Sequence, residues 1–393
     1  MSTEAILFIH HANDMYGADI GLLHSIKCLD RNKYCPIVIL PSDMPPPGKL
    51  SSELEHLGIE YHFAPLGILR RKYLSPRKII PLALELAKGV AHVRSVARKR
   101  GVALVYINTI VSVSGAIGGR LAGVPVLWHI REILAMPRPV RWALHNALRL
   151  CADRIVCISS AVRDSLLKEA PFLTNKSVVV YNAVSVAPSP AVTQDVSLRD
   201  ELGVPHGVPL VGMVGRVTHW KGQEVLAEAA GVVLQNHPDA HFVAVGGYFA
   251  DEVHYLEKLK SLISRLGLNG RFHLADYRPN VTAVYRALDI FVLPSRKPEP
   301  FGRVTVEAMM QGRAVIATNH GGTCELIEEG VTGVLVPPSD SRALVNAIER
   351  LLKDRTLGEN MGRAAAAYAR ENFSLPRYQD RMRNVIDGLI VAH

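Results

Sequence analysis

Two glutamates, Glu299 and Glu307, stand eight residues apart around a glycine turn, and they are the residues of this sequence best placed to do chemistry. Gly302 between them can take a positive φ and let a ligand approach the backbone. A helix that starts near Arg303 presents unpaired N–H groups and a positive dipole end, which suit phosphate. Ionised carboxylates only accept hydrogen bonds, so they suit hydroxyls. Phosphate with hydroxyls describes a nucleotide sugar, although on this stretch alone a loop charge and a solvated helix residue explain the two glutamates equally well.

Two cations stand before a second expected helix in the same half of the chain. Residues 209–215 are apolar enough for a buried strand, and Arg216 follows them. Lys221 and Gly222 then open a helix that extends to about Gln235. An arginine fork and a lysine point charge beside a helix N-terminus suit a diphosphate. The alternative is a surface arginine and a surface lysine without a ligand.

The first half of the chain begins with a strand, a glycine turn and a helix. The strand is expected at residues 5–9, Gly17 lies in the turn, and the helix extends from about Ile20 to Leu29. Ligands bind at such a turn when it lies at the carboxyl end of a parallel sheet. Neither half has G-x-G-x-x-G after its first strand, which argues against a nucleotide-binding dehydrogenase. Asp19 follows the turn and could simply cap the helix.

A histidine follows another expected strand of the first half. Residues 123–128 form this strand, and it delivers His129 to its carboxyl end. On spacing alone, a packed core histidine is the better interpretation. Arg131 and Glu132 come next, and they either pair with each other or face an acceptor.

The glutamate motif resembles the E-x7-E signature of retaining GT-B glycosyltransferases of family 4. The matching segments are Glu299-Pro-Phe-Gly-Arg-Val-Thr-Val-Glu307-Ala, Gly312-Arg-Ala-Val-Ile-Ala-Thr, Gly321-Gly322, Gly215-Arg216 with Lys221-Gly222, and Tyr16-Gly17-Ala18-Asp19, where the family usually has Gly-Gly-x-Glu. The resemblance covers most of the chain. It implies the α/β class and the GT-B architecture, in which two doubly wound Rossmann-like domains face each other across a cleft.

The resemblance also assigns roles to residues. It gives Glu299 and His129 contacts with the transferred sugar, and we expect these two to be the catalytic residues. It places Glu307 on the ribose, and residues 277–281 at the nucleobase. The donor diphosphate is expected at Gly17, Arg216, Lys221, Phe301, Gly302 and Arg303.

The resemblance implies transfer with retention of anomeric configuration. Two carboxylates at the sugar would indicate double displacement, but Glu307 is assigned to the ribose, so front-face transfer assisted by the leaving phosphate is more economical. The sequence has no D-x-D pair, so we expect no metal and no other cofactor. The two cations and a helix dipole would then neutralise the leaving diphosphate.

Length and composition fit two globular domains. The chain has 393 residues, 48% hydrophobic and 21% charged. A Pro/Ser-rich stretch near residue 187 indicates a linker. We expect an acceptor-side domain at 1–185, a linker at 186–200, a nucleotide-sugar-binding domain at 201–374, and a terminal helix at 375–393 that returns to the first domain.

Localisation follows from what the sequence lacks. No apolar run is long enough to span a bilayer, and the N-terminal apolar run predicts a first strand, not a signal peptide. Five cysteines without CxxC spacing indicate buried, reduced thiols in the cytosol. We therefore expect a cytoplasmic protein, attached peripherally to the inner face of the membrane.

The expectation of membrane attachment rests on charge. The net charge is +9, and residues 70–100 hold ten Lys and Arg against the single acid Glu85. This segment predicts a helix with Ser75 as N-cap and Gly101 after its end. A domain helix with one buried face explains its apolar residues but not its charge. The alternative is a surface that docks on anionic lipid, and we expect no nucleic acid partner.

The sequence therefore predicts a glycosyltransferase that moves a sugar, from UDP or another nucleoside diphosphate, to a saccharide or lipid-linked acceptor. Bacterial surface polysaccharide, lipopolysaccharide or glycolipid synthesis is the expected setting. The rival hypothesis is a non-catalytic nucleotide- or membrane-binding protein. It leaves the set of Arg216, Lys221, Glu299 and Glu307 without a purpose.

Overall fold

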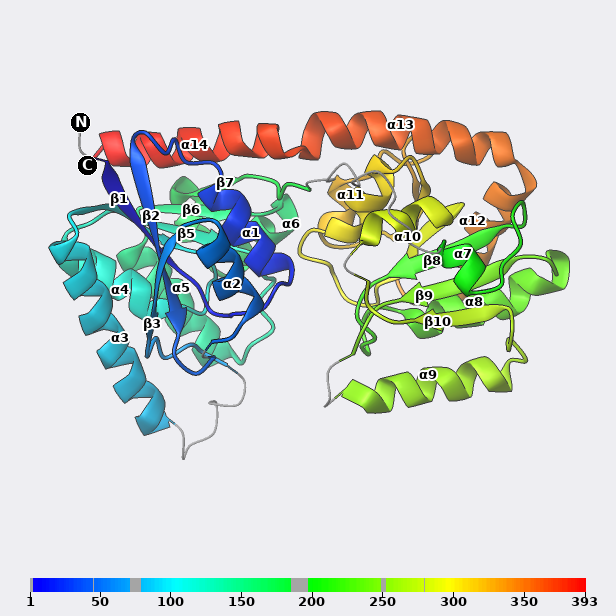
Figure 1. Cartoon of the computed structure of the whole chain (residues 1–393), viewed down its shortest axis with the longest axis horizontal. Coiled ribbons are helices and arrows are strands. Elements are labelled where there is room, and N and C mark those ends of the chain that lie inside the picture. Colours follow the sequence, from blue (N-terminus) through cyan, green and yellow to red (C-terminus); the bar gives the residue numbers. More distant parts are fainter. Residues whose placement is uncertain (1–2, 45, 71–78, 185–196, 249–251, 279) are drawn as a thin grey trace. The chain divides into compact units, whose positions relative to one another are not determined.

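The computed structural model describes most of the chain, namely residues 3–44, 46–70, 79–184, 197–248, 252–278 and 280–393. The chain divides into two compact units (Figure 1). Unit 1 comprises Met1–Ala183 and Leu375–His393, and unit 2 comprises Val184–Ser374. Each unit is a parallel β-sheet with helices on both faces, which confirms the predicted α/β class.

Unit 1 is built on a seven-stranded parallel sheet in the order β3-β2-β1-β4-β5-β6-β7. Its strands are β1 Glu4–Ile9, β2 Tyr34–Pro41, β3 Glu60–Ala64, β4 Val102–Ile107, β5 Val126–Ile130, β6 Arg154–Cys157 and β7 Ser177–Val179. The central strands are buried along almost their whole length, as their continuous apolar runs require. The strand order reverses between β1 and β4, and the carboxyl ends of strands at such a point commonly bind ligands.

Helices cover both faces of this sheet. They are α1 Gly17–Ile26, α2 Lys49–His56, α3 Ile79–Lys99, α4 Val113–Ala122, α5 Arg138–Cys151, α6 Ser160–Glu169, the 3-10 helix η3 Pro171–Lys176, and α14 Leu375–Val391. Helices α1, α2 and α14 share one hydrophobic core with the sheet. Helix α3 packs on α4, and α4 packs on α5. Glycines in α4 permit close packing, because a Cβ on Gly115 would lie 2.8 Å from Ile107 Cδ1.

The C-terminal helix α14 belongs to unit 1. Tyr378, Met382 and Ile386 are buried in the core of this unit. Near its C-terminal end, Asp387 Oδ1 accepts a hydrogen bond from Tyr34 Oη at 2.9 Å. The last helix therefore completes the core of the first unit.

Unit 2 is built on a six-stranded parallel sheet in the order β10-β9-β8-β11-β12-β13. Its strands are β8 Leu210–Val214, β9 His241–Val245, β10 Phe272–Ala275, β11 Ile290–Leu293, β12 Ala314–Thr318 and β13 Val334–Val336. Its helices are α7 Leu198–Glu201, α8 Gln223–Asn236, α9 Val253–Arg265, α10 Val281–Ala287, α11 Arg303–Met310, η5 Gly322–Glu325, α12 Ser341–Lys353 and α13 Arg355–Phe373. The strand order reverses between β8 and β11, so the loops after these strands begin at the same edge of the sheet.

Several local predictions need correction. The first helix begins at Gly17 and not near Ile20, and neither β3 nor α5 was predicted. Gly321 and Gly322 form a second glycine loop after β12, which leads into the short 3-10 helix η5. The expected linker at 186–200 lies mostly outside the described residues, and its last residues already belong to α7. The proposed N-cap Ser75 also lies outside the described residues.

Two expectations about surface and thiols can be compared with the structure. Among the described residues, no helix is both long enough and apolar enough to cross a bilayer. All five cysteines are free. Three of them are buried, whereas Cys35 and Cys324 are only half-buried, so the prediction of buried thiols is wrong for these two.

Candidate active site

The predicted glycine turn at Gly302 is confirmed, and packing explains it. Gly302 has φ +94° and is the N-cap of α11. A Cβ at this position would lie 2.7 Å from Thr323 Cγ2, so both the backbone angle and the available space require glycine. Thr305, in the first turn of α11, is buried, and its Oγ1 has no hydrogen-bond partner among the described residues. The first turn of α11 therefore presents N–H groups and a free hydroxyl.

Glu299 is held in place by two side chains and by the loop after β12, which contains Gly321 and Gly322. Its side chain is buried, and Oε1 accepts hydrogen bonds from Lys221 Nζ at 2.7 Å and from Ser295 Oγ at 2.6 Å. The Gly322 N–H donates to the Glu299 carbonyl at 2.7 Å. A Cβ on Gly321 would lie 2.5 Å from that carbonyl oxygen. The double glycine thus allows the loop that carries Glu299 to lie against the loop after β12.

Lys221 reaches Glu299 because α8 begins beside the end of β11. Gly222 has φ +84°, and a Cβ there would lie 1.9 Å from the Pro294 carbonyl oxygen. The Lys221 ammonium also lies 4.4 Å from the centre of the Trp220 ring. Two residues predicted separately, a diphosphate cation and a sugar-contacting carboxylate, therefore form one buried ion pair.

A second predicted carboxylate, Glu307, is also fully engaged. Oε1 accepts from Arg303 Nε at 2.7 Å, and Oε2 accepts from Tyr285 Oη at 2.8 Å. Burial, followed by the nearby Glu307 carboxylate, raises the pKa of Tyr285 well above 10, so this hydroxyl stays a donor. Arg303, which the sequence assigned to the diphosphate, is thus one turn from Glu307 and bonded to it.

The remaining predicted residues of unit 2 differ in exposure. Arg216 follows β8, its side chain is 39% exposed, and its Nη1 lies 4.0 Å from Glu252 Oε2. Phe301 is buried and packs edge-on against Phe373, so its ring takes part in packing. Tyr277, expected near the nucleobase, is 56% exposed.

In unit 1, His129 lies inside β5 and not after it, so the prediction that it follows the strand is wrong. The ring is fully buried. Nδ1 faces Tyr106 Oη and Arg131 Nη2, the latter at 3.2 Å. Nε2 has no hydrogen-bond partner among the described residues. Burial, followed by the charge of Arg131, lowers the pKa of His129 well below 6.5, so the imidazole is neutral. An unpaired buried donor costs about 1–3 kcal/mol, which calls for an explanation.

Arg131 is buried and does not pair with the Glu132 side chain. Its Nε donates to Asn108 Oδ1 at 2.9 Å, and its Nη1 donates to Asn182 Oδ1 at 2.8 Å. The Arg131 backbone N–H donates to Glu132 Oε2 at 3.1 Å, and Thr109 Oγ1 donates to Glu132 Oε1 at 2.6 Å. Neither asparagine was predicted as a site residue.

The turn before α1 is organised by Asp19. Its Oδ2 accepts from the Tyr16 backbone N–H at 2.8 Å, which confirms the capping interpretation, and its Oδ1 lies 2.9 Å from His10 Nε2. Gly17 is exposed, and a Cβ there would meet nothing within 4 Å. The chain's own packing therefore does not require glycine at this position.

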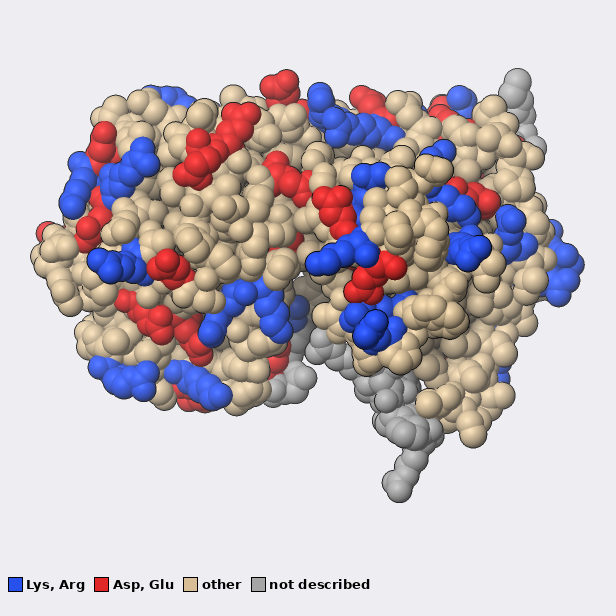
Figure 2. Space-filling view, turned by 180° about the vertical axis from the view of Figure 1, so that it is seen from behind, with Lys and Arg blue, Asp and Glu red and all other residues tan. Residues whose placement is uncertain are grey.

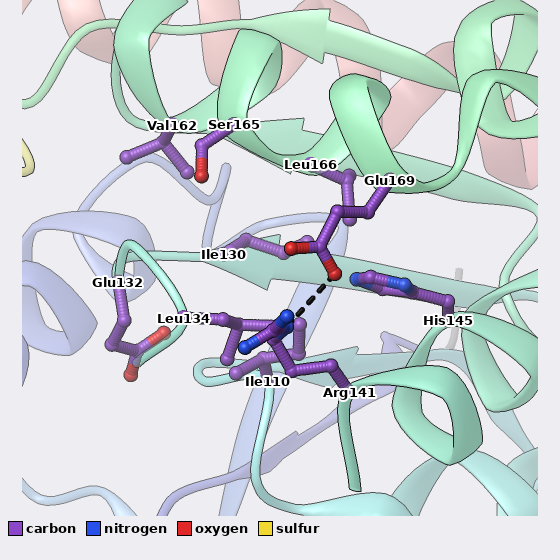
Figure 3. A pocket seen from close by; sticks show the side chains of 10 residues that line it. All are labelled: Ile110, Ile130, Glu132, Leu134, Arg141, His145, Val162, Ser165, Leu166 and Glu169. Carbon is purple, nitrogen blue, oxygen red and sulfur yellow. Dashed lines mark hydrogen bonds and ion pairs between the residues drawn. The ribbon is translucent and has the colours of Figure 1, made fainter. Parts of the chain in front are cut away.

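A small pocket in unit 1 lies beside Glu132 (Figure 3). It holds about 290 Å³ of empty space, part of it open to solvent. Arg141 Nε donates to Glu169 Oε2 at 2.8 Å on one wall, with the His145 ring close by, and the Glu132 side chain lies apart from this pair. Burial raises the pKa of the Glu132 carboxyl. The sequence did not indicate this pocket, because α5 was missed.

Two family models match the chain, one in each unit. The model described as Glycosyltransferase Family 4 matches residues 17–187, and the model described as Glycosyl transferases group 1 matches residues 196–368. The chain belongs to the group 1 glycosyltransferases. This confirms the family resemblance of the glutamate motif.

Curated relatives within this family match part of the chain. The lipopolysaccharide core biosynthesis mannosyltransferase LpcC of Rhizobium leguminosarum bv. viciae is 36% identical over 188 residues, which is 48% of this chain and 53% of the relative. A D-inositol 3-phosphate glycosyltransferase of Corynebacterium diphtheriae is 31% identical over 61% of this chain and 58% of the relative. The matches thus span a little over half of the length of these relatives.

Solved structures confirm the GT-B fold over almost the whole chain. The Anabaena protein HepE, crystallised with UDP and glucose, has a TM-score of 0.80 at 27% identity over 97% of this chain and 99% of HepE. Sucrose-phosphate synthase from Thermosynechococcus elongatus has a TM-score of 0.79 over 99% of this chain and 100% of that structure, at 21% identity. The second likeness shows the fold alone.

Proposed function

We propose that this chain transfers a sugar from a nucleoside diphosphate sugar to a saccharide or lipid-linked acceptor. The observation that carries the proposal is the 2.7 Å hydrogen bond from Lys221, beside the turn at Gly222, to Glu299. Gly302 caps α11, and Glu307 lies one turn into that helix. A cation, a helix N-terminus and two carboxylates match a phosphate-linked polyol. The solved complex of HepE with UDP and glucose supports a UDP-linked donor.

In this proposal the donor is divided among three groups of residues. The diphosphate takes Lys221 and Arg216, together with the first N–H groups of α11. The ribose hydroxyls take Glu307, which Tyr285 orients through its 2.8 Å hydrogen bond. The transferred sugar takes Glu299 and the Nε2–H of His129. The buried and otherwise unpaired Nε2 supports a hydroxyl contact at that atom.

Transfer is proposed to proceed on the front face, with retention. Double displacement needs two carboxylates at the sugar, and Glu307 is proposed to bind the ribose, which leaves Glu299 alone there. The leaving phosphate would instead accept the proton of the attacking hydroxyl. Lys221, Arg216 and the dipole of α11 would stabilise the negative charge that develops on the diphosphate, in place of a metal ion.

The acceptor is proposed to be a lipopolysaccharide core or a glycolipid, as the relative LpcC suggests. Attachment to the inner membrane face would follow from the charge of unit 1. Figure 2 shows separate Lys and Arg side chains along the outer edge of this unit, with few acidic side chains beside them. Helix α3 adds the exposed side chains of Ile80 and Leu84.

Nucleotide binding provides the test. UDP, GDP, ADP and NAD are compared by thermal shift, and the nucleoside diphosphates that bind raise the melting temperature by mass action. The corresponding nucleotide sugars are then incubated with lipid extracts, and released nucleoside diphosphate is measured. Stabilisation by NAD alone would refute the proposal. Stabilisation by a diphosphate without any release of it would favour the rival hypothesis of a non-catalytic nucleotide-binding protein.

A further inference from the structure

The hydrogen bonds around His129 determine which ring nitrogen carries the proton. A guanidinium only donates hydrogen bonds, and Arg131 Nη2 lies 3.2 Å from His129 Nδ1. Nδ1 must therefore be the acceptor, because a proton there would face the N–H of Arg131. In a neutral ring the proton then lies on Nε2, the nitrogen without a partner among the described residues.

We infer that Arg131 is a positioning residue that keeps the proton of His129 on Nε2, and that the C-terminal helix α14 takes part through Tyr378 and Ser25. The inference rests on the proposed function only for the use of the Nε2–H, which would donate to a hydroxyl of the transferred sugar. The arrangement of the protein groups stands without it.

The rigid placement of Arg131 supports this role. The guanidinium is fixed by the amide oxygens of Asn108 and Asn182, at 2.9 and 2.8 Å. Helix α1 has a glycine where this group packs against it, since a Cβ on Gly21 would lie 2.3 Å from Arg131 Nη1. Glycine inside a helix is unfavourable, so the space it leaves for the guanidinium accounts for its presence.

The connection to α14 runs through three hydroxyl groups. Tyr378 Oη lies 2.7 Å from Ser25 Oγ, and Ser25 Oγ lies 2.8 Å from Tyr106 Oη. Tyr106 Oη in turn contacts His129 Nδ1, and Arg131 Nη2 lies 3.4 Å from Ser25 Oγ. Burial raises the pKa of both tyrosines, so both keep their protons. Tyr378 of α14 is thus two hydrogen bonds away from Tyr106, the residue that contacts His129 Nδ1.

The first test reads the tautomer directly, in the full-length protein without ligand. Nitrogen-15 NMR of the His129 ring is expected to show a protonated Nε2 and an unprotonated Nδ1 from pH 6 to 8.5. Glutamine can both donate and accept, so Arg131→Gln is expected to give a mixture of the two tautomers. A proton on Nδ1 in the unmodified protein, or pure Nε2–H in Arg131→Gln, would overturn the inference.

Two further variants keep the test decisive if Arg131→Gln does not fold. Gly21→Ala displaces the guanidinium without removing it and is expected to give the same mixed tautomer. Tyr378→Phe removes one hydroxyl, and it should lower kcat/KM roughly three- to tenfold, the effect of one neutral hydrogen bond. Tyr34→Phe is the matched control, because it removes a tyrosine hydroxyl that donates a hydrogen bond to Asp387 on α14, away from His129. Equal losses of kcat/KM in Tyr378→Phe and Tyr34→Phe would show that α14 has only a structural role.

Nucleotide binding separates this inference from the proposed function. Titration with UDP is followed by calorimetry in the same protein samples. Absence of UDP binding together with an Arg131-dependent tautomer would refute a UDP-linked donor and support the positioning role. UDP binding together with an unchanged tautomer in Arg131→Gln would support a UDP-linked donor and refute the positioning role of Arg131.

Discussion

Lys221 Nζ and Glu299 Oε1 form an ion pair at 2.7 Å, with side chains that are only 14% and 6% exposed. The family resemblance assigns these residues to different parts of the donor, the diphosphate and the sugar. In the structure they neutralise each other. Removal of one partner from a buried pair leaves an uncompensated charge, so conservative substitutions are needed to separate their roles.

The first prediction separates the two glutamates. Glu307→Gln removes a charged acceptor for ribose hydroxyls, and a charged hydrogen bond is worth about 1.5–3 kcal/mol, so UDP or GDP affinity should fall roughly ten- to a hundredfold. Glu299→Gln should leave nucleotide affinity nearly intact and reduce kcat, because its carboxylate meets the sugar. Calorimetry and initial rates measure the two effects. Equal losses of nucleotide affinity in the two variants would contradict the assignment.

Local sequence signals predicted the backbone of this site but not its pairings. The strand, turn and helix around Gly302 and the turn at Gly222 follow from apolar runs and glycine positions. The ion pair of Lys221 with Glu299 joins residues 78 positions apart, and it depends on the adjacency of β8 and β11, which no local pattern encodes. For the same reason Tyr378, 353 positions from Ser25, gave no signal of its role.

His129 shows a second limit of sequence analysis. Its apolar neighbours correctly indicated a strand, but the end of that strand was misplaced, and the core interpretation and the ligand interpretation both looked sound. The structure shows a ring that has features of each, since it is fully buried and still has one unpaired nitrogen. Polar residues that follow strands, such as Asn108, were the available signal for its surroundings.

The second prediction concerns metal ions. Turnover with the preferred nucleotide sugar should be unchanged within twofold in EDTA, because Lys221, Arg216 and the N-terminus of α11 would carry the charge of the leaving diphosphate. Initial rates are compared in EDTA, in Mg²⁺ and in Mn²⁺. A strict requirement for either cation would show that the phosphate site has been misassigned. Lys221→Met should be slower than the unmodified protein in every one of these buffers.

The third prediction concerns stability at mildly acidic pH. Burial lowers the pKa of His11 from 6.5 to about 3, and that of His129 well below 6.5. Below pH 6.5 the unfolded chain binds protons that the folded chain does not, so stability is present above 6.5 and is lost as the pH falls. Each such histidine contributes a slope of up to about 1.4 kcal/mol per pH unit.

Urea unfolding between pH 7.5 and 5 measures this slope. His11→Gln should reduce the slope by up to about 1.4 kcal/mol per pH unit, which corresponds to one proton. His206→Gln is the control, since that side chain is 79% exposed and water solvates it in both states. An unchanged slope in His11→Gln would show that His11 is protonated in the folded protein.

The last prediction concerns membrane docking by the basic segment 70–100, and the structure shows which of its cations suit a test. Arg70 lies 3.2 Å from Asp43, and Arg100 is bonded to both carboxylate oxygens of Glu60, so these two cations are already engaged. Lys88 and Arg94 lie within α3 itself, and both are exposed. They are the better choice for charge reversal.

The test is co-sedimentation with liposomes at low and high salt. The unmodified protein should pellet with anionic vesicles at low salt and stay in solution with neutral ones, since each Lys or Arg near such a surface is worth about 1 kcal/mol and salt screens the attraction. Reversal of Lys88 and Arg94 to Glu should weaken binding more than tenfold. The matched control reverses Lys258 and Arg265 on the exposed face of α9, which changes the net charge equally. Equal losses in both double variants would reduce the effect to net charge, and binding that ignores lipid charge would leave α3 as an ordinary domain helix.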